Sequence, residues 1–321
     1  MAGLRIAVLG TGSIGRLTRD ALDGVDGAEV VRMLSPREPY TWGDDVDVVA
    51  VCTPNGLHVS HAREAVAAGK HVVVEKPLTL DVAEGEELLA DADQAGVTVS
   101  VISQRRWEPV VQAVKQAIDS GVLGRPLVGE CVMKWFRDPS YYRDVPWRGT
   151  TDLDGGVLFN QGVHVIDLLR WLLGPVDGVD GATVTRVHQI ESPDTAAALL
   201  HFQSGALGVV AATTAAHDPQ PAHLNLWFEH GTIRLDDDEL VEWSVPGIAA
   251  PDLTGGVGSG SADPTAIGVL GHRRQWEAIV ADLEAGRQPA VSGRDGLGTA
   301  ALVAAIHQAS TDGTRVAPKV R

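Results

Sequence analysis

The stretch L-R-I-A-V-L-G-T-G-S-I-G, residues 4–15, decides the fold of this chain. Its first half is an apolar strand, and its second half is a G-x-G-x-x-G loop that leads into the helical run I-G-R-L-T-R-D-A-L. Gly10 permits a tight turn, Gly12 lets the backbone approach a pyrophosphate, and Gly15 allows the helix to pack closely on the strand. The context predicts a dinucleotide-binding βα unit, with a plain βα turn as the alternative.

Strand-like and helix-like segments alternate from this stretch to about residue 119. The helical segments, residues 58–69 and 79–96, are rich in alanine. The strands are rich in valine without polar alternation, which indicates burial on both faces and a parallel sheet covered by helices. The expected strands are residues 4–9, 28–34, 46–51, 71–74 and 97–102.

The sequence pattern changes from about Leu127, after which short strand-like runs follow one another and are separated by short turns. This pattern predicts an antiparallel sheet. The runs are residues 183–190, 197–202, 207–213, 224–235 and 240–245, and two amphipathic helices, residues 276–286 and 297–309, close the chain. At 321 residues the chain suits two domains. We place a dinucleotide-binding domain at residues 1–119 and a domain for substrate binding and oligomerisation at residues 120–321.

Charge and cysteine content exclude several classes of protein. The 26 basic and 42 acidic residues give a formal net charge of −16, which argues against a nucleic acid or an anionic membrane as partner. Cys52 and Cys131 are too few for a disulfide framework and lack metal-ligand spacing, so no metal is expected. No apolar run reaches the roughly 18 residues of a membrane span, and the first strand is too short for a signal peptide. A cytoplasmic location is expected.

Two polar segments can each be interpreted either as ordinary loop or turn structure or as part of a functional site. Residues 251–271 are rich in glycine, serine and aspartate and lack a hydrophobic period, which is typical of a loop, with an active-site flap as the alternative. The acidic run at residues 236–239 is expected to be a hairpin tip rather than a metal site, because side chains point apart along an extended chain.

The end of the second strand bears on the choice of cofactor. An acidic residue for the adenosine ribose is expected near Ser35, but the chain has Ser35-Pro36-Arg37 there. A hydroxyl and a guanidinium suit a 2′-phosphate, so NADP is favoured and NAD stays possible, the alternative being that Arg37 lies on a solvated loop. Only about ten residues separate Ser35 from the next strand. Either the fold is trimmed at this edge or the adenine pocket is open.

Three further motifs carry polar groups. T-P-N-G-L-H (residues 53–58) and E-K-P (residues 75–77) follow neighbouring parallel strands, so both should border the cofactor crevice. The stretch G-G-V-L-F-N-Q-G-V-H-V-I-D-L-L-R-W-L-L-G, from Gly155, predicts one helix. Asn160, His164 and Asp167 have i, i+4, i+7 spacing and project from one face of it.

The order of these motifs, with W-R at residues 147–148 between E-K-P and the helix, resembles the Gfo/Idh/MocA oxidoreductases, the glucose–fructose oxidoreductase and inositol dehydrogenase family. The resemblance runs nearly end to end, since the closing W-E-A-I-V-A-D-L-E-A-G-R-Q-P-A-V-S-G-R-D-G also fits it. It implies an α/β chain with an N-terminal Rossmann-type domain and a C-terminal α+β domain. The large, mostly antiparallel sheet of the C-terminal domain would form the substrate wall and the interface of a homodimer or homotetramer. Asn160 stands where sugar and polyol dehydrogenases of the family often have aspartate.

The resemblance also implies roles for single residues. Lys76, whose bond to Pro77 should be cis, would lie between nicotinamide and substrate and stabilise developing negative charge on oxygen. His164 would accept the hydroxyl proton, and Asn160 would bind the substrate or orient the ring. Asp167 is either the partner of His164 or an anchor of the helix. The alternative for Lys76 is a strand-end ion pair with Glu75.

The expected substrate contacts are Lys76, Arg106, Asn160 and His164. The expected cofactor contacts are Gly10, Thr11, Gly12, Ser13, Ile14, Ser35, Arg37, Thr53, Pro54, Asn55, His58, Glu75, Lys76, Trp147 and Arg148.

The function that follows is transfer of a hydride between NAD(P) and a secondary alcohol or ketone of a sugar or cyclitol. One rival is an NAD-dependent glycoside hydrolase of the same fold, which would keep its cofactor bound. The other rival is a non-catalytic sensor of dinucleotide or sugar, against which the presence of both Lys76 and His164 counts.

Overall fold

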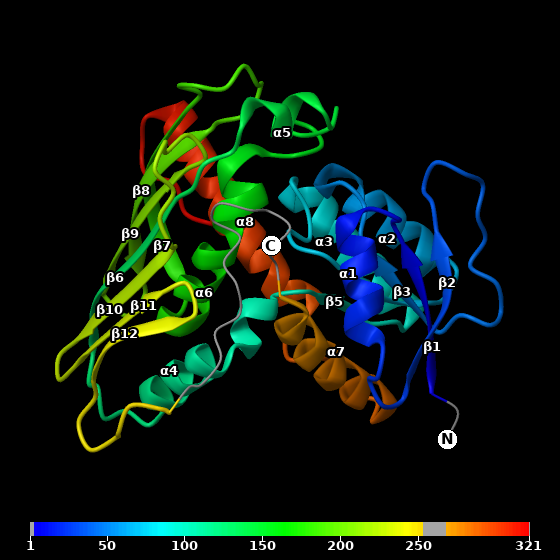
Figure 1. Cartoon of the computed structure of the whole chain (residues 1–321), viewed down its shortest axis with the longest axis horizontal. Helices are drawn as coiled ribbons and strands as arrows, with labels where there is room; N and C mark the ends of the chain where they lie inside the picture. The colour runs from blue at the N-terminus through cyan, green and yellow to red at the C-terminus, as the bar shows by residue number, and fades with distance from the viewer. Residues whose placement is uncertain (1–2, 253–267, 321) are drawn as a thin grey trace. The chain divides into compact units, whose positions relative to one another are not determined.

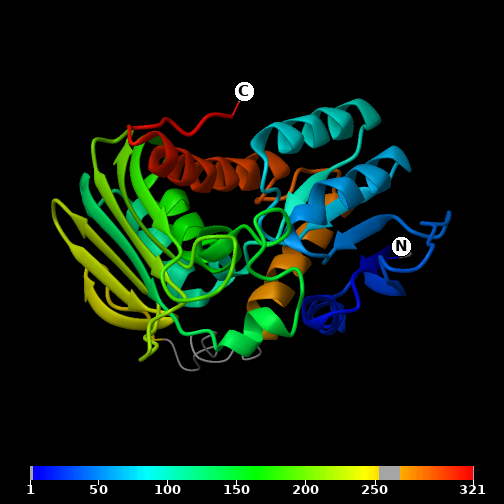
Figure 2. The same cartoon turned by 90° about the horizontal axis from the view of Figure 1, so that it is seen from above.

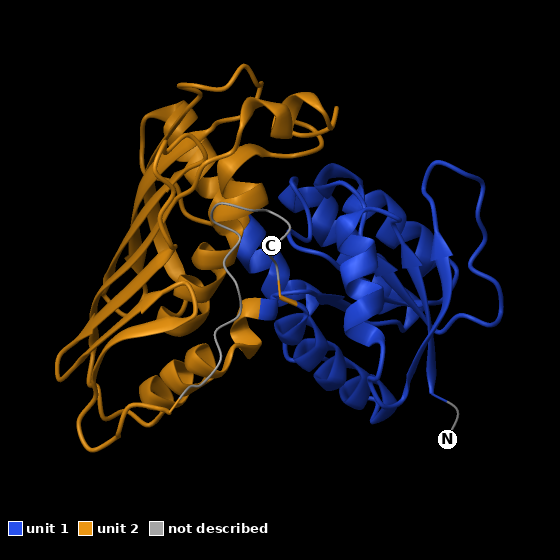
Figure 3. Cartoon of the chain, viewed as in Figure 1, with its two compact units in different colours: residues 1–104, 269–300, 320–321 blue, residues 105–268, 301–319 orange. Residues whose placement is uncertain are grey.

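The computed structural model describes residues 3–252 and 268–320. By internal contacts the chain forms two compact units, shown in Figure 3. Unit 1 holds residues 1–104, 269–300 and 320–321, and unit 2 holds residues 105–268 and 301–319. The closing part of the chain therefore contributes to both units. The predicted functional division at residue 119 differs from this grouping, which assigns residues 105–119 to unit 2 and residues 269–300 to unit 1.

Unit 1 contains a five-stranded, fully parallel sheet with the order β2-β1-β3-β4-β5. All five strands predicted from the valine-rich runs are present. They are β1 (Leu4–Leu9), β2 (Ala28–Leu34), β3 (Val48–Val51), β4 (His71–Val74) and β5 (Val99–Val101). Residues 35–47 contain neither helix nor strand, and β2 is an edge strand. The sheet is therefore trimmed at this edge, which was one of the two alternatives, the other being an open adenine pocket.

Helices cover both faces of this sheet, as Figure 1 shows. The helix α1 (Ser13–Leu22) packs with α7 (Val269–Glu284), and α2 (His58–Ala67) packs with α3 (Val82–Ala95). One core cluster joins β1 and β3 to the buried Trp276 and Ile279 of α7. The valines of the central strands are buried because helices lie over both of their faces.

Unit 2 contains a seven-stranded sheet with the order β12-β11-β10-β6-β9-β8-β7. Only the β6–β9 pair is parallel, so the prediction of a mostly antiparallel sheet is confirmed. The strands are β6 (Pro126–Lys134), β7 (Val176–Val184), β8 (Thr195–Phe202), β9 (Leu207–Thr213), β10 (His223–Phe228), β11 (Thr232–Asp236) and β12 (Glu239–Ser244).

One predicted strand is wrong in most of its length. Residues 183–190 were expected to be extended, but β7 ends at Val184. The reason is Asp194, whose buried carboxylate accepts hydrogen bonds from the backbone amides of Arg186, Val187 and His188. These amides therefore fold round a side chain instead of pairing with a strand.

Helix α6 (Val163–Leu173) covers one face of the large sheet, as Figures 1 and 2 show. Gly129 of β6 permits this packing, because a Cβ there would lie 2.4 Å from Leu173 and 2.6 Å from Leu169. The helix predicted from Gly155 is present over residues 156–173, and residues 158–162 within it form a π-helical turn directly before α6. Such turns often occur at functional sites. The remaining helices are α4 (Pro109–Asp119), α5 (Pro139–Arg143) and α8 (Gly293–Asp312), and single 3₁₀ turns span residues 55–57 and 104–107.

Two other expectations concern polar segments. The acidic run at residues 236–239 does form the hairpin turn between β11 and β12, with Asp237 at φ 53°. The predicted loop at residues 251–271 lies mostly outside the described residues. Within residues 3–252 and 268–320, no helix is long and apolar enough to cross a membrane.

Candidate active site

The glycine loop after β1 has the geometry of a pyrophosphate site. Gly10 has φ +133°, and a Cβ there would lie 2.4 Å from the carbonyl oxygen of Cys52; a Cβ on Gly15 would lie 1.9 Å from that of Gly10. Gly12, in contrast, faces open space. It precedes α1, whose amino end has no side-chain cap and no acidic residue in its first turn. The backbone N–H groups at this end are therefore available to an anion, and the loop fits a dinucleotide.

The carboxyl ends of β1 and β3 lie next to each other where the strand order reverses. Such a switch point is where open α/β sheets bind their ligands. The predicted contacts Thr11, Gly12 and Ser13 are exposed at this edge, and Ile14 is half-buried. The structure thus brings the glycine loop and the T-P-N motif to one edge of unit 1.

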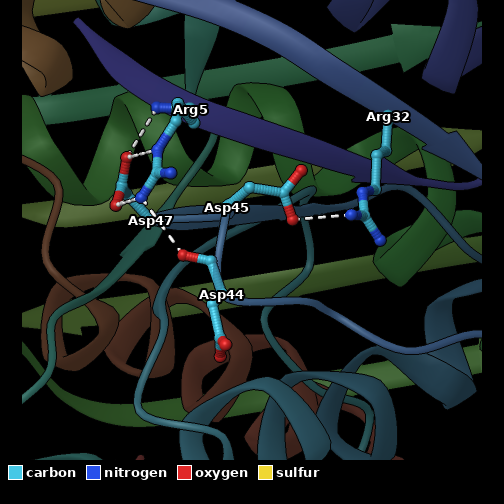
Figure 4. A network of polar contacts seen from close by, with 5 residues as sticks. All are labelled: Arg5, Arg32, Asp44, Asp45 and Asp47. Atoms are coloured by element: carbon cyan, nitrogen blue, oxygen red, sulfur yellow. Dashed lines mark hydrogen bonds and ion pairs between the residues drawn. The ribbon is translucent and has the colours of Figure 1, made fainter. Parts of the chain in front are cut away.

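The arginines at this edge of the sheet, Arg5 on β1, Arg32 on β2 and Arg37 after β2, differ in their partners. Arg5 binds Asp47 and the carbonyl oxygen of Asp44, and Arg32 binds Asp45 at 2.6 Å, as Figure 4 shows. The hydrogen bond from Arg32 lowers the pKa of Asp45, and that from Arg5 lowers the pKa of Asp47.

Arg37 is exposed, and its backbone N–H donates to Ser35 Oγ at 3.3 Å. No carboxylate among the described residues forms an ion pair with its guanidinium, which makes Arg37 the arginine here that is open to an anion.

His58 braces two loops rather than presenting a polar atom. Its ring is 1% exposed, Nδ1 lies 2.7 Å from the carbonyl oxygen of Pro77, and Nε2 lies 2.8 Å from that of Thr53. Burial lowers the pKa of His58. Because both ring nitrogens contact backbone carbonyls, His58 fixes the end of β3 to the turn after β4. The sequence suggested that His58 contacts the cofactor, but neither ring nitrogen is available for such a contact. Thr53 Oγ1 in turn lies 3.0 Å from Nδ1 of His61.

The end of β4 holds Glu75 and Lys76. The Lys76–Pro77 bond is cis, as the resemblance implied. Glu75 is buried, receives the backbone N–H of Lys76 at 3.3 Å, and lies 3.3 Å from Nε2 of His272 on α7. Burial raises the pKa of Glu75, but the contact with His272 and the charges of His272, Lys76 and His58 together outweigh burial, so the pKa of Glu75 lies below its usual range. Glu75 therefore anchors the loop that carries Lys76 to α7.

Asn160 in unit 2 is paired with a carboxylate. Its Nδ2 donates to Oδ1 of Asp154, whose side chain is 1% exposed. A carboxylate only accepts hydrogen bonds from an amide, so this contact fixes which end of the amide faces Asp154. The amide oxygen of Asn160 is thereby directed elsewhere.

Asp167 pairs with Arg106, and this contact is consistent with the anchoring role, one of the two alternatives for Asp167. Nε and Nη2 of Arg106 donate to its two carboxylate oxygens at 2.7 and 2.5 Å, and both side chains are buried. The Arg106 guanidinium also lies 5.3 Å from the ring centroid of Trp171. A bidentate pair of this kind holds its geometry firmly. Arg106, expected to contact substrate, is thus held by a buried ion pair in unit 2.

The predicted residues divide between the units. Unit 1 holds the glycine loop, Ser35, Arg37, the T-P-N-G-L-H residues, Glu75 and Lys76, and unit 2 holds Arg106, Trp147, Arg148, Asn160, His164 and Asp167. Sequence reasoning missed Asp154 and His272. Asp154 lies in T-D-L-D-G-G just before the helix, which is a weak signal, and nothing in the sequence around His272 connects it with Glu75.

The chain matches two family models. Residues 38–103 match a model described as an oxidoreductase family with an NAD-binding Rossmann fold, and residues 111–234 match one described as the GFO/IDH/MocA C-terminal domain.

Relatives of known activity match nearly the whole chain. A D-apiose dehydrogenase of Paraburkholderia graminis is 27% identical over 97% of this chain and 88% of its own length. A myo-inositol 2-dehydrogenase of Thermotoga maritima is 26% identical over 91% and 92%. The crystal structure of the WlbA dehydrogenase from Bordetella pertussis, in complex with NADH and UDP-GlcNAcA, is 29% identical, with a TM-score of 0.89 over 99% of this chain and 100% of that one.

A Rossmann-type unit with an open glycine loop and a second unit built on a mostly antiparallel sheet define a nicotinamide-dependent oxidoreductase. The chain belongs to the Gfo/Idh/MocA family.

Proposed function

We propose that this protein transfers a hydride between NADP(H) and a secondary alcohol or ketone of a sugar or cyclitol. The single observation that carries the proposal is the E-K-P loop. Glu75 is fixed by His272, and His58 binds the carbonyl of Pro77, so Lys76 is held between two anchored residues. The relatives named as apiose and inositol dehydrogenases support a sugar or cyclitol as the substrate class.

Lys76 and His164 divide the acid–base work in this proposal. The bound nicotinamide supplies the hydride acceptor when an alcohol is oxidised. The ammonium group of Lys76 stabilises the negative charge that develops on the substrate oxygen, and preorganised charge of this kind is often the largest single contribution to catalysis. The imidazole of His164 accepts the hydroxyl proton.

Asn160 binds a substrate hydroxyl through its amide oxygen. The motivation is the contact with Asp154, which engages the amide nitrogen as donor, and the amide oxygen is the acceptor end of the group. A substrate hydroxyl can donate a hydrogen bond to this oxygen. An aspartate at position 160 would instead place its carboxylate beside that of Asp154, and the two like charges would repel each other. The contact therefore accounts for asparagine where many sugar dehydrogenases of the family have aspartate.

NADP is the preferred cofactor in this proposal. Gly12 and the uncapped amino end of α1 take the pyrophosphate, and Arg37 with Ser35 takes the 2′-phosphate. Arg37 suits this role because Arg5 and Arg32 are already bound to aspartates.

The oligomer forms through the face of the large sheet that α6 does not cover. Leu207 and Val209 on β9 and Val184 on β7, with β8 between these two strands, are 38–46% exposed, and gathered exposed apolar side chains mark interaction surfaces. Sedimentation equilibrium should show a dimer or tetramer that Val209→Lys weakens. A wild-type monomer would remove this part of the proposal.

The experiment that tests the function is a panel of sugars and cyclitols, each offered with NAD⁺ and with NADP⁺ and read at the absorbance of reduced nicotinamide. We expect turnover of at least one sugar or cyclitol, faster with NADP⁺. Tight cofactor binding with no turnover across the panel would favour the sensor instead.

A further inference from the structure

One loop of unit 2, residues 185–194, is folded on a buried carboxylate, and we call it the Asp194 loop. The side chain of Asp194 is 0% exposed, and its two oxygens accept hydrogen bonds at 2.8–2.9 Å from the backbone amides of residues 186–188. The hydroxyl of Thr195 donates to the same carboxylate at 2.9 Å. Burial raises the pKa of Asp194, but these donors outweigh burial, so the pKa lies below its usual range and the carboxylate is charged.

The Asp194 loop is closed on itself and fixed to the large sheet. Oγ1 of Thr185 donates to the carbonyl oxygen of Ser192 at 3.0 Å, which joins the two ends of the loop. The backbone N–H of Thr214, directly after β9, donates to the carbonyl oxygen of Asp194 at 3.0 Å. Nε2 of His188 lies 3.1 Å from the carbonyl oxygen of Thr214. The loop is therefore a preformed part of unit 2.

The Asp194 loop holds the segment that carries the W-R motif. The carbonyl oxygen of Gly149, the residue after Arg148, accepts three hydrogen bonds at 3.0 Å, from the backbone amides of Glu191 and Ser192 and from Oγ of Ser192. A carbonyl oxygen has two lone pairs, so three donors saturate it and fix its position. Gly149 has φ +76°, and a Cβ there would lie 2.6 Å from Cγ2 of Ile190, so this close approach requires glycine.

The same loop holds the start of the helix that carries Asn160 and His164. The backbone N–H of Val157 donates to the carbonyl oxygen of Pro193 at 2.9 Å. Gly156, at φ +75°, packs so closely that a Cβ there would lie 2.6 Å from the same oxygen. The π-helical turn that contains Asn160 follows directly after Val157. One short loop thus contacts both segments of unit 2 that carry candidate site residues.

These contacts are more than the end of a strand requires. The sequence of residues 183–190 has the pattern of a strand, and Asp194 overrides that pattern by binding the amides of the loop. Such conflicts between local pattern and structure are expected at functional sites. A loop that served only to end β7 would need its contacts with the sheet. The contacts with Gly149 and Val157 reach instead the residues next to the W-R motif and the π-helical turn.

We propose that Asp194 is a positioning residue, because the loop that it folds holds the W-R motif and the Asn160 helix in one arrangement and so places the cofactor and substrate contacts of unit 2 together. This inference rests on the proposed function for the roles of those contacts, and it keeps Arg148 against the cofactor, as the resemblance implies. Asp194 and Ser192 touch neither substrate nor cofactor in this proposal. They act through the backbone of the two segments.

The mildest test is Ser192→Ala, which removes the hydroxyl donor to Gly149 and keeps both backbone donors. The Kd of NADPH should rise about threefold, within the range of one hydrogen bond. Ser120→Ala is the matched control, because Oγ of Ser120 also donates to a backbone carbonyl in unit 2, that of Ala117 at 2.7 Å. Both variants should lose stability in urea to a similar degree, but only Ser192→Ala should weaken NADPH.

The stronger test is Asp194→Asn, which puts an amide N–H₂ where a carboxylate oxygen accepts backbone amides. The Kd of NADPH should rise about tenfold or more, and kcat/KM for the best sugar of the panel should fall about tenfold or more, because the loop loses two or more hydrogen bonds to a charged group. Hydrogen exchange should become faster in residues 186–192 and also in residues 147–151 and 156–162. If Asp194→Asn fails to fold, the comparison of Ser192→Ala with Ser120→Ala decides.

Two results would overturn the inference. One is an unchanged Kd of NADPH in Ser192→Ala at the same loss of stability as in Ser120→Ala, since the loop would then be structural only. The other is faster exchange in Asp194→Asn that is confined to residues 186–192. Both readouts are made without turnover. A weakened NADPH complex in a protein that turns over no sugar would therefore refute the proposed reaction and still support the positioning role.

Discussion

The two units hold their candidate residues in different ways. In unit 1 most of these contacts are made with the main chain. His58 contacts two backbone carbonyls, Glu75 accepts a hydrogen bond from the backbone N–H of Lys76, and the glycine loop is shaped by backbone contacts. In unit 2 the candidate residues pair with other side chains, Asn160 with Asp154 and Arg106 with Asp167. Substitutions in unit 1 should therefore act mainly by disturbing backbone contacts. Substitutions in unit 2 should act by leaving the side chain of the partner residue unpaired.

The largest effect is expected at His164 of unit 2. If it is the general base, His164→Asn should lower kcat/KM for alcohol oxidation about 10²–10⁴-fold. The wild-type rate should fall on the acid side as the imidazole is protonated, and the variant should lack this limb. His217→Asn, at an exposed histidine, is the control and should keep it. An acid limb that persists in His164→Asn would assign the base to another group.

The buried pair of unit 2 gives the next largest effect, on stability. Arg106→Met leaves the Asp167 carboxylate buried without its bidentate partner, which should cost about 3–5 kcal/mol of unfolding free energy. Adding Asp167→Leu should recover much of this loss, because an apolar pair can replace a buried ion pair. Arg315→Met breaks an exposed pair with Asp180 in the same unit and should change stability little. Urea denaturation of the four proteins measures these differences; an Arg106→Met protein as stable as wild type would show that the pair anchors nothing.

The glycine loop tests the backbone fit of unit 1. A methyl group on Gly15 would meet the Gly10 carbonyl, so Gly15→Ala should destabilise the protein by about 3 kcal/mol or more, since a backbone atom cannot rotate away. Gly12→Ala meets open space and should leave the melting temperature unchanged while weakening NADPH. Thermal melts and NADPH fluorescence titration separate the two. Unchanged NADPH affinity in Gly12→Ala would place the pyrophosphate elsewhere.

The smallest effect is expected at Arg37, at the edge of unit 1. Arg37→Ala should narrow the affinity gap between NADPH and NADH by about 1.5–3 kcal/mol, the value of a charge-assisted hydrogen bond. Arg19→Ala, an exposed arginine paired with Asp20, is the control and should leave the gap unchanged. Equal wild-type affinities, or a preference for NADH, would refute the choice of NADP.

The same division explains what the sequence predicts and what it does not. The strands of unit 1 follow from runs of valine, and the glycine loop, T-P-N-G-L-H and E-K-P follow strand ends, where parallel strands must meet. Local pattern is sufficient there. In unit 2, the strand expected over residues 183–190 was lost to Asp194, a single side chain that captures three backbone amides.

Partners distant in sequence are harder to foresee. Arg106 and Asp167 lie 61 residues apart, and each reads alone as a polar residue near a site. His272 reaches Glu75 from the other end of unit 1's sequence. No local period encodes such pairs, because they depend on how segments pack after they have formed. The pairing of Arg106 with Asp167 and the contact of His58 with Pro77 could not be predicted from the sequence for this reason.

The measurement that tests the account most directly separates binding from chemistry at Lys76. The Lys76→Ala protein is titrated with NADPH and assayed with the best substrate of the panel, beside the wild type and Lys70→Ala as a control. We predict that the Kd of NADPH stays within about threefold of the wild-type value. The activation free energy should rise by about 3–4 kcal/mol, so that kcat falls roughly 10²–10³-fold. Turnover within a few-fold of the wild type would contradict the account, because Lys76 would then play no part in the reaction.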